Sequence, residues 1–207
     1  MEESWKEKFV NWFEEEIADS DKPLDEHWDV KVDEINNSIW IKATSPRTPY
    51  SVFVNISRGF ASLQIYTGIE TAIMEIKERL KIYRTLLMLN GRWKMAKYVI
   101  GGDNDEIIIL TDLDLAALNR EEFNDALTVT LLALNDMVEK LGLDEEYREA
   151  QLMHVLKIVD EKLEKGETKE QITEYLIKTF GISRETAREI VREATKNKDE
   201  PDFPIYR

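Results

Sequence analysis

The residue types that most often carry catalysis or bind metals are sparse in this sequence. It contains no cysteine, which excludes structural disulfides, thiolate metal ligands and cysteine nucleophiles. Its two histidines, His27 and His154, are far apart, and neither belongs to a His-x-x-x-His or His-Glu-x-x-His pattern. Carboxylate pairs are so numerous among 42 acidic residues that they select no acid–base site. We therefore predict no catalytic residues, no metal ligands, no cofactor and no enzymatic activity. Only a carboxylate or histidine site of unrecognised pattern would make the protein a hydrolase.

The run Asp103-Asn104-Asp105-Glu106 resembles the start of a calcium-binding loop. Such a loop also needs a glycine and a glutamate at its twelfth position, and both are missing here. We expect a solvated hairpin turn at this point instead. The sequence also contains no glycine-rich phosphate-binding loop.

One stretch of the chain is locally basic. No acid occurs between Glu78 and Asp103, and Lys77, Lys81 and Arg84 lie along one face of an expected helix. These three cations could form an anion or phosphate site. The alternative is that they pair with carboxylates of the same protein.

A second basic feature lies near the C-terminus, in a two-helix unit with Gly181-Ile182-Ser183 at its turn, which resembles helix-turn-helix motifs. Three arginines form a ridge at i, i+4 spacing that could face phosphates: Arg184, Arg188 and Arg192. A glutamate follows each of them and can pair with a neighbouring arginine, so the face is nearly neutral. A nucleic-acid-associated regulator is therefore the alternative function, and a helical packing or dimerisation module is the other interpretation.

Period-two alternation assigns three aromatic side chains to the more polar face of an expected sheet. These side chains are Trp40, Phe53 and Tyr66. Polar residues such as Lys42 and Gln64 share their face. Large aromatics on a polar face are typical of interface anchors, so we predict a partner-binding or dimer surface here. The alternative is that the C-terminal helices of the same chain cover these side chains.

Composition limits the class of protein. A hydrophobic content of 43% predicts a folded chain, and a formal charge of −14 argues against a surface that wraps nucleic acid throughout. No stretch reaches the roughly 18 to 20 apolar residues of a membrane-spanning helix, and the start lacks a signal-peptide pattern, so we expect a cytoplasmic protein. Heavy use of Lys, Glu and Arg with few glutamines leans towards a thermophilic source.

The period of the apolar residues predicts the elements that position these side chains. Aromatic residues at helical spacing predict a helix over residues 3–18. Four successive runs of strand character then imply an antiparallel meander, at residues 28–33, 39–43, 50–57 and 60–66. The period returns to 3.6 from Ile69 to a left-handed cap at Asn90-Gly91. We expect the apolar side of this helix to face inward, with Ile69, Ile73, Ile76, Leu80, Tyr83 and Leu87.

The rest of the chain is a hairpin followed by helices. The hairpin is predicted at residues 93–100 and 106–111, and Asn119 can cap the helix that follows. Beyond Gly142 the pattern is wholly helical, and from Asn197 it has no periodicity. We therefore predict an α+β domain at residues 1–142, a helical extension with a two-helix unit at 143–196, and an irregular tail at 197–207.

The order helix, meander, helix, hairpin, helix, with one helix closing on Leu-Leu-Met-Leu-Asn90, resembles the YbjN family and, more broadly, the fold of type III secretion chaperones. In those proteins a helix ending in Asn leads through a stretch with a Lys, here Lys97, to a hairpin. The resemblance covers about residues 1–141. This chain departs from it by an extra strand in the meander and by the helical extension.

The resemblance implies an α+β domain without enzymatic activity that often dimerises and holds partner polypeptides. Secretion-chaperone function does not follow from the fold alone. We expect a non-enzymatic interaction or chaperone-like protein that binds a polypeptide partner or a second copy of itself through apolar and aromatic surface. We expect no membrane partner, and nucleic acid only in the alternative function.

Overall fold

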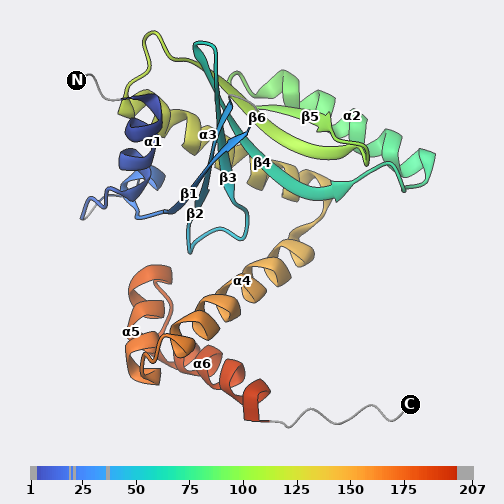
Figure 1. Ribbon diagram of the computed structural model, residues 1–207. Helices are drawn as coiled ribbons and strands as arrows, with labels where there is room; N and C mark the ends of the chain where they lie inside the picture. Colours follow the sequence, from blue (N-terminus) through green and yellow to red (C-terminus); the bar gives the residue numbers. More distant parts are fainter. Residues whose placement is uncertain (1–3, 19, 21, 36–37, 200–207) are drawn as a thin grey trace. The chain divides into compact units, whose positions relative to one another are not determined.

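The computed structural model describes residues 4–18, 20, 22–35 and 38–199 (Figure 1). The chain divides into two compact units. The first comprises Met1–Ser45 and Tyr50–Glu145, and the second comprises Pro46–Pro49 and Glu146–Arg207. The first unit combines helices with an antiparallel sheet, and the described part of the second is helical. The predicted α+β class is therefore confirmed.

Six strands form one antiparallel sheet in the order β1-β2-β3-β4-β6-β5. The strands are β1 (Asp29–Ile35), β2 (Ser38–Thr44), β3 (Val52–Ser57), β4 (Phe60–Glu70), β5 (Lys97–Gly101) and β6 (Glu106–Asp114). The first four strands are the predicted meander, and the predicted hairpin places β6 beside β4. β4 is longer than predicted, because its pairing with β6 continues past an irregularity between Tyr66 and Glu70.

Two helices, α1 (Trp5–Glu14) and α3 (Arg120–Leu141), supply large apolar side chains to the core on one face of the sheet. Completely buried residues of these helices and of that face include Phe9, Phe13, Ile41, Val54, Leu63, Ile109, Phe123 and Leu127. The ring of Phe123 lies 4.9 Å from that of Phe9 and 5.3 Å from that of Phe13. The aromatic stripe of the first helix therefore lies in the core.

α1 is shorter than the predicted helix over residues 3–18. It begins with a capping box in which Ser4 and Glu7 bond reciprocally, and it ends at Glu14. The chain then turns back, because the Phe13 carbonyl accepts a bond from the Trp28 amide at 2.9 Å. This tertiary bond replaces the next helical turn, and Ile17 is left exposed.

The second helix, α2 (Ile76–Arg92), differs from the prediction in its start and in the face that it buries. It begins seven residues after Ile69, which belongs to β4. Its completely or nearly buried residues are Leu86 and Leu89. The predicted inward residues Ile76, Leu80 and Leu87 are instead 66%, 61% and 70% exposed. α2 carries two apolar stripes, and periodicity alone cannot decide which stripe packs against the rest of the fold.

The predicted left-handed cap at Asn90-Gly91 is also wrong. α2 continues through Gly91 to Arg92. The Asn90 side chain accepts a bond from the Tyr98 amide at 2.7 Å and donates one to the Tyr98 carbonyl at 3.0 Å. Lys97 donates to the carbonyls of Trp93 at 3.0 Å and Asn90 at 3.4 Å. The Asn90 side chain therefore satisfies the backbone amide and carbonyl of Tyr98 on the edge strand β5, as a neighbouring strand would.

α3 begins where predicted. The Asn119 side chain accepts a bond from the Glu122 amide at 3.0 Å, and the helix ends at Gly142 with φ of 71°. The Tyr98 hydroxyl donates to the Ala133 carbonyl of α3 at 2.8 Å, which ties β5 to this helix. Burial raises the pKa of this hydroxyl.

The second unit contains α4 (Asp144–Glu164), α5 (Lys169–Phe180) and α6 (Arg184–Asp199). Its own core consists of buried side chains from the three helices: Val159, Ile172, Leu176, Ala187, Val191 and Ala194. Thr168 and Gln171 form a capping box at the start of α5, and Gly181 ends it with φ of 65°. α6 continues to Asp199, so the predicted end of the helices at residue 196 is three residues early. The rest of the predicted tail, 200–207, lies outside the described residues.

Candidate interaction surfaces

The histidine and acidic side chains that could bind a metal are dispersed in the described part of the chain. In the part of the chain that the structure describes, no three His, Asp or Glu side chains lie close enough together to hold a metal ion. His27 is exposed, with Nδ1 2.9 Å from the Glu14 carbonyl. The acidic hairpin turn is tied to the end of β4, because Asn104 donates to the Glu70 carboxylate at 2.9 Å. None of the helices within the described ranges has both the length and the apolar character needed to cross a membrane.

The three predicted aromatic residues do share one face of the sheet. In the register of the strands, Trp40 lies opposite Asn55, and Phe53 lies between Lys42 and Gln64. These residues alternate with the buried residues of the core, so their face is opposite to the one that α1 and α3 cover. The rings of Phe53 and Tyr66 are in edge-to-face contact with centroids 5.3 Å apart. All three aromatics are half-buried.

Polar groups lie beside two of these rings, those of Phe53 and Tyr66. The Lys42 ammonium lies 5.7 Å from the centroid of the Phe53 ring, and the Tyr66 hydroxyl donates to the Gln64 side chain at 3.0 Å. Burial, and to a smaller extent the charge of Glu106, raises the pKa of Tyr66. The face therefore presents two aromatic rings that contact each other and polar neighbours.

Apolar residues of the hairpin extend this face beyond the prediction. Ile108 lies opposite both Tyr66 on β4 and Val99 on β5, and only 9% of it is exposed. A Cβ at Gly101 would lie 2.6 Å from the end of the Ile108 side chain, so the glycine leaves room for that side chain against the end of β5. The sequence did not reveal this extension, because Ile107 to Leu110 is apolar without alternation.

The predicted anion-binding residues Lys77, Lys81 and Arg84 lie on the solvent side of α2, and all three are exposed. In the described part of the chain none of them forms an ion pair. Other cations of the same stretch do, because Arg79 lies 3.6 Å from Asp105 and Arg92 lies 3.2 Å from Asp136. Internal pairing therefore applies to the neighbours of the three predicted residues.

The arginine ridge on α6 is largely neutralised, and part of the neutralising charge comes from another helix. Arg184 pairs with Glu170 of α5 at 2.8 Å and also with Glu174, and Arg188 lies 3.4 Å from Glu170. Arg192 pairs with Glu189 at 3.1 Å, at the predicted i, i+3 spacing. The contribution of α5 is a tertiary contact that the spacing along one helix could not reveal.

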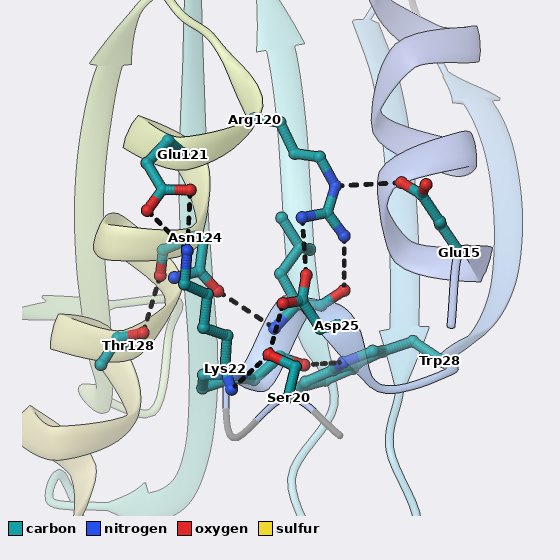
Figure 2. A network of polar contacts seen from close by, with 11 residues as sticks. Glu15, Ser20, Lys22, Asp25, Trp28, Arg120, Glu121, Asn124 and Thr128 are labelled. Carbon is teal, nitrogen blue, oxygen red and sulfur yellow. Dashed lines mark hydrogen bonds and ion pairs between the residues drawn. The ribbon is translucent and has the colours of Figure 1, made fainter. Parts of the chain in front are cut away.

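A partly buried ionic network, centred on the buried carboxylate of Asp25, joins the start of the chain to α3 (Figure 2). Asp25, at the end of the short helix η1 (Pro23–Asp25), accepts bonds from Arg120 and from the Ser20 hydroxyl, each at 2.6 Å. Both hydrogen bonds lower the pKa of Asp25, and the bond from Ser20 has the larger effect. Arg120 also lies 3.1 Å from the Glu15 carboxylate.

Hydrogen bonds between side chains and backbone groups extend the same network. The Asn124 side chain accepts a bond from the Leu24 amide at 3.2 Å, and the Trp28 indole donates to the Pro23 carbonyl at 2.8 Å. At the surface, Lys22 pairs with Glu121 at 2.6 Å (Figure 2). These contacts hold η1 against α3, and we assign the network a structural role.

Comparison with known proteins divides the chain at nearly the same place as the structure does. A family model labelled HTH_78 and described as a domain of unknown function matches residues 142–206. No curated protein shows a significant match. Neither family model carries the YbjN or secretion-chaperone name, so that resemblance stays a prediction. The model described as domain of unknown function (DUF8183) matches residues 8–141, well over half of the chain, and the chain therefore belongs to the DUF8183 family.

Proposed function

We propose that this protein is a non-enzymatic interaction protein that binds a partner polypeptide through the outer sheet face, defined by Trp40, Phe53 and Tyr66. The observation that supports the proposal is the placement of these aromatics together on the face of the sheet opposite to α1 and α3. Aromatic anchors of this kind typically dominate the binding energy of an interface.

The sheet presents this surface already ordered. The edge-to-face contact of Phe53 with Tyr66, and the bond from Tyr66 to Gln64, restrict the rings before a partner arrives. Binding therefore costs less side-chain entropy than it would for free rings. The formal charge of −14 repels most other acidic proteins and so favours a partner with apolar side chains and compensating charge.

The test is a comparison of captured polypeptides. Full-length protein is immobilised and exposed to nuclease-treated lysate, alongside a Trp40→Ser, Tyr66→Ser double variant. The control is Leu132→Ser, which changes an exposed apolar residue of α3. We expect a defined set of polypeptides to be retained by wild type and control, and to be lost from the double variant, as measured by mass spectrometry. Equal capture by all three proteins would contradict the proposal.

The second candidate function is that of a nucleic-acid-associated regulator. It is favoured by the HTH_78 label of the family model, which abbreviates helix-turn-helix, and by the arginine ridge of α6 after the turn at Gly181. The ion pairs of Arg184 with Glu170 and Glu174 weigh against it, because they oppose phosphate contact.

Salt dependence tests this second candidate. If the ridge contacts phosphates, binding of the full chain to a duplex DNA weakens steeply as salt rises, and an Arg188→Glu, Arg192→Glu variant loses it. Lys157→Glu changes an exposed cation of α4 and serves as the control. Absence of binding at low salt, or equal binding by both variants, would exclude the ridge as a phosphate-binding surface.

A further inference from the structure

The outer side of α2 carries apolar side chains that the rest of the first unit, as far as the structure describes it, does not cover. Ile76, Leu80 and Leu87 follow one another along one side of the helix, at spacings of four and seven residues. Each is more than half exposed, as is Met88, on the adjoining side. Contiguous apolar surface of this kind on a folded protein commonly marks an interface.

The charge beside this stripe restricts what can cover it. Lys77, Lys81 and Arg84 border the apolar residues on the exposed side and have no acidic partner in the described part of the chain. Two α2 helices packed face to face would bring like charges together at the edge of an apolar contact, which is unfavourable. The helix is therefore suited to a surface that combines apolar side chains with carboxylates.

Such a surface occurs on the first half of α4. Leu152 is 52% exposed and Met153 is 66% exposed, although both are large apolar residues. Glu145 and Glu149 are exposed and lie seven and three residues before Leu152, on the same side of the helix. Arg148 is exposed on this side too, four residues before Leu152, so the carboxylates outnumber the cations there by two to one. Apolar residues and an excess of carboxylates therefore share one exposed side of α4, as apolar residues and cations share one exposed side of α2.

We propose that the exposed side of α2 binds the exposed side of α4 from a second copy of the chain. The occupant is specified by charge complementarity between Lys81 and Arg84 on α2 and Glu145 and Glu149 on α4, with Leu80 and Leu152 in the apolar part of the contact. A symmetric dimer contains this contact twice, because each copy contributes one α2 and one α4. This interface is separate from the outer sheet face and does not depend on the function proposed for that face.

Charge reversal in separate chains tests the pairing. Variant A carries Lys81→Glu and Arg84→Glu, and variant B carries Glu145→Lys and Glu149→Lys. We expect wild type to be a dimer at micromolar concentration by light scattering. Either variant alone should dimerise at least about tenfold more weakly, because both of its contacts join like charges.

Mixing the variants gives the decisive result. In a dimer of A with B, both contacts join opposite charges, so we expect the mixture to form heterodimers and a chain with all four changes to form homodimers. A monomeric wild type, or a wild-type dimer that neither variant weakens, would overturn the proposal. Recovery in the four-change chain without heterodimers in the mixture would also overturn it, because the pairing would then lie within one chain.

The apolar part of the contact has its own test. Leu80→Ser should weaken the wild-type dimer, whereas Leu132→Ser on the outside of α3 should not. Thermal unfolding checks that each variant remains folded, which we expect because all the changed side chains are exposed. An unchanged dimer with Leu80→Ser would contradict the proposed contact.

Discussion

Asp25 is a single carboxylate whose charge is coupled to the stability of the fold. Ser20 and Arg120 donate to it and lower its pKa, so the folded chain holds the proton of Asp25 more weakly than the unfolded chain does. The stability that this carboxylate contributes is therefore fully present above its unfolded-state pKa. It is lost as the pH falls through the folded-state pKa.

We predict that Asp25→Asn lowers the free energy of unfolding by about 1–3 kcal/mol at neutral pH, because Arg120 loses a buried charged partner. The difference from wild type should shrink below about pH 4, where the wild-type carboxyl group is itself increasingly protonated. Urea unfolding across this pH range measures both effects. Asp33→Asn, at an exposed position of β1, is the control. A difference that is independent of pH would contradict the assigned role of the charge.

Asn90 is a second residue with a specific geometric role. We predict that Asn90→Ala costs about 1–3 kcal/mol, because it removes both bonds to the Tyr98 backbone at the edge of β5. Hydrogen exchange should be faster at the Tyr98 amide than in the exposed control Asn135→Ala. Unchanged exchange at Tyr98 would show that water replaces the side chain without loss.

At the scale of elements, sequence patterns were sufficient where alternatives differ locally. Strand alternation placed Trp40, Phe53 and Tyr66 on one face, and the cap at Asn119 located the start of α3. Sequence patterns were insufficient where a helix face or a charged side chain contacts residues that are distant in sequence. The face of α2 that packs is decided by β5 and α3, and the acids opposite Arg184 come from α5. The spacing of residues within one helix does not indicate either of these contacts.

A capping prediction belongs to the same scale. Thr168→Ala removes the hydroxyl that accepts from the Gln171 amide at 3.3 Å, so we expect a loss of about 1 kcal/mol and faster hydrogen exchange in the first turn of α5. Thr168→Ser keeps the hydroxyl and should retain most of this stability. If the serine variant is as destabilised as the alanine variant, methyl packing rather than capping determines the loss.

At the scale of the whole molecule, each of the two units has its own apolar core. The first is built on the sheet, α1 and α3, and the second on Val159, Ile172 and Leu176 with the small residues of α6. The two family models divide the chain between residues 141 and 142, close to the division of the structure. Because the family models and the two cores divide the chain at nearly the same place, we expect each unit to unfold separately.

We predict that Leu176→Ala opens the second unit while the first stays folded. Leu176 is completely buried, and its truncation should cost about 2–5 kcal/mol in the core that α4, α5 and α6 form. Hydrogen exchange should then increase throughout α4, α5 and α6, while β4, β6 and α3 keep their protection. Leu127→Ala, in the core of the first unit, should give the opposite pattern. If either change instead exposed both units together, the two cores would form one cooperative structure despite the division in sequence.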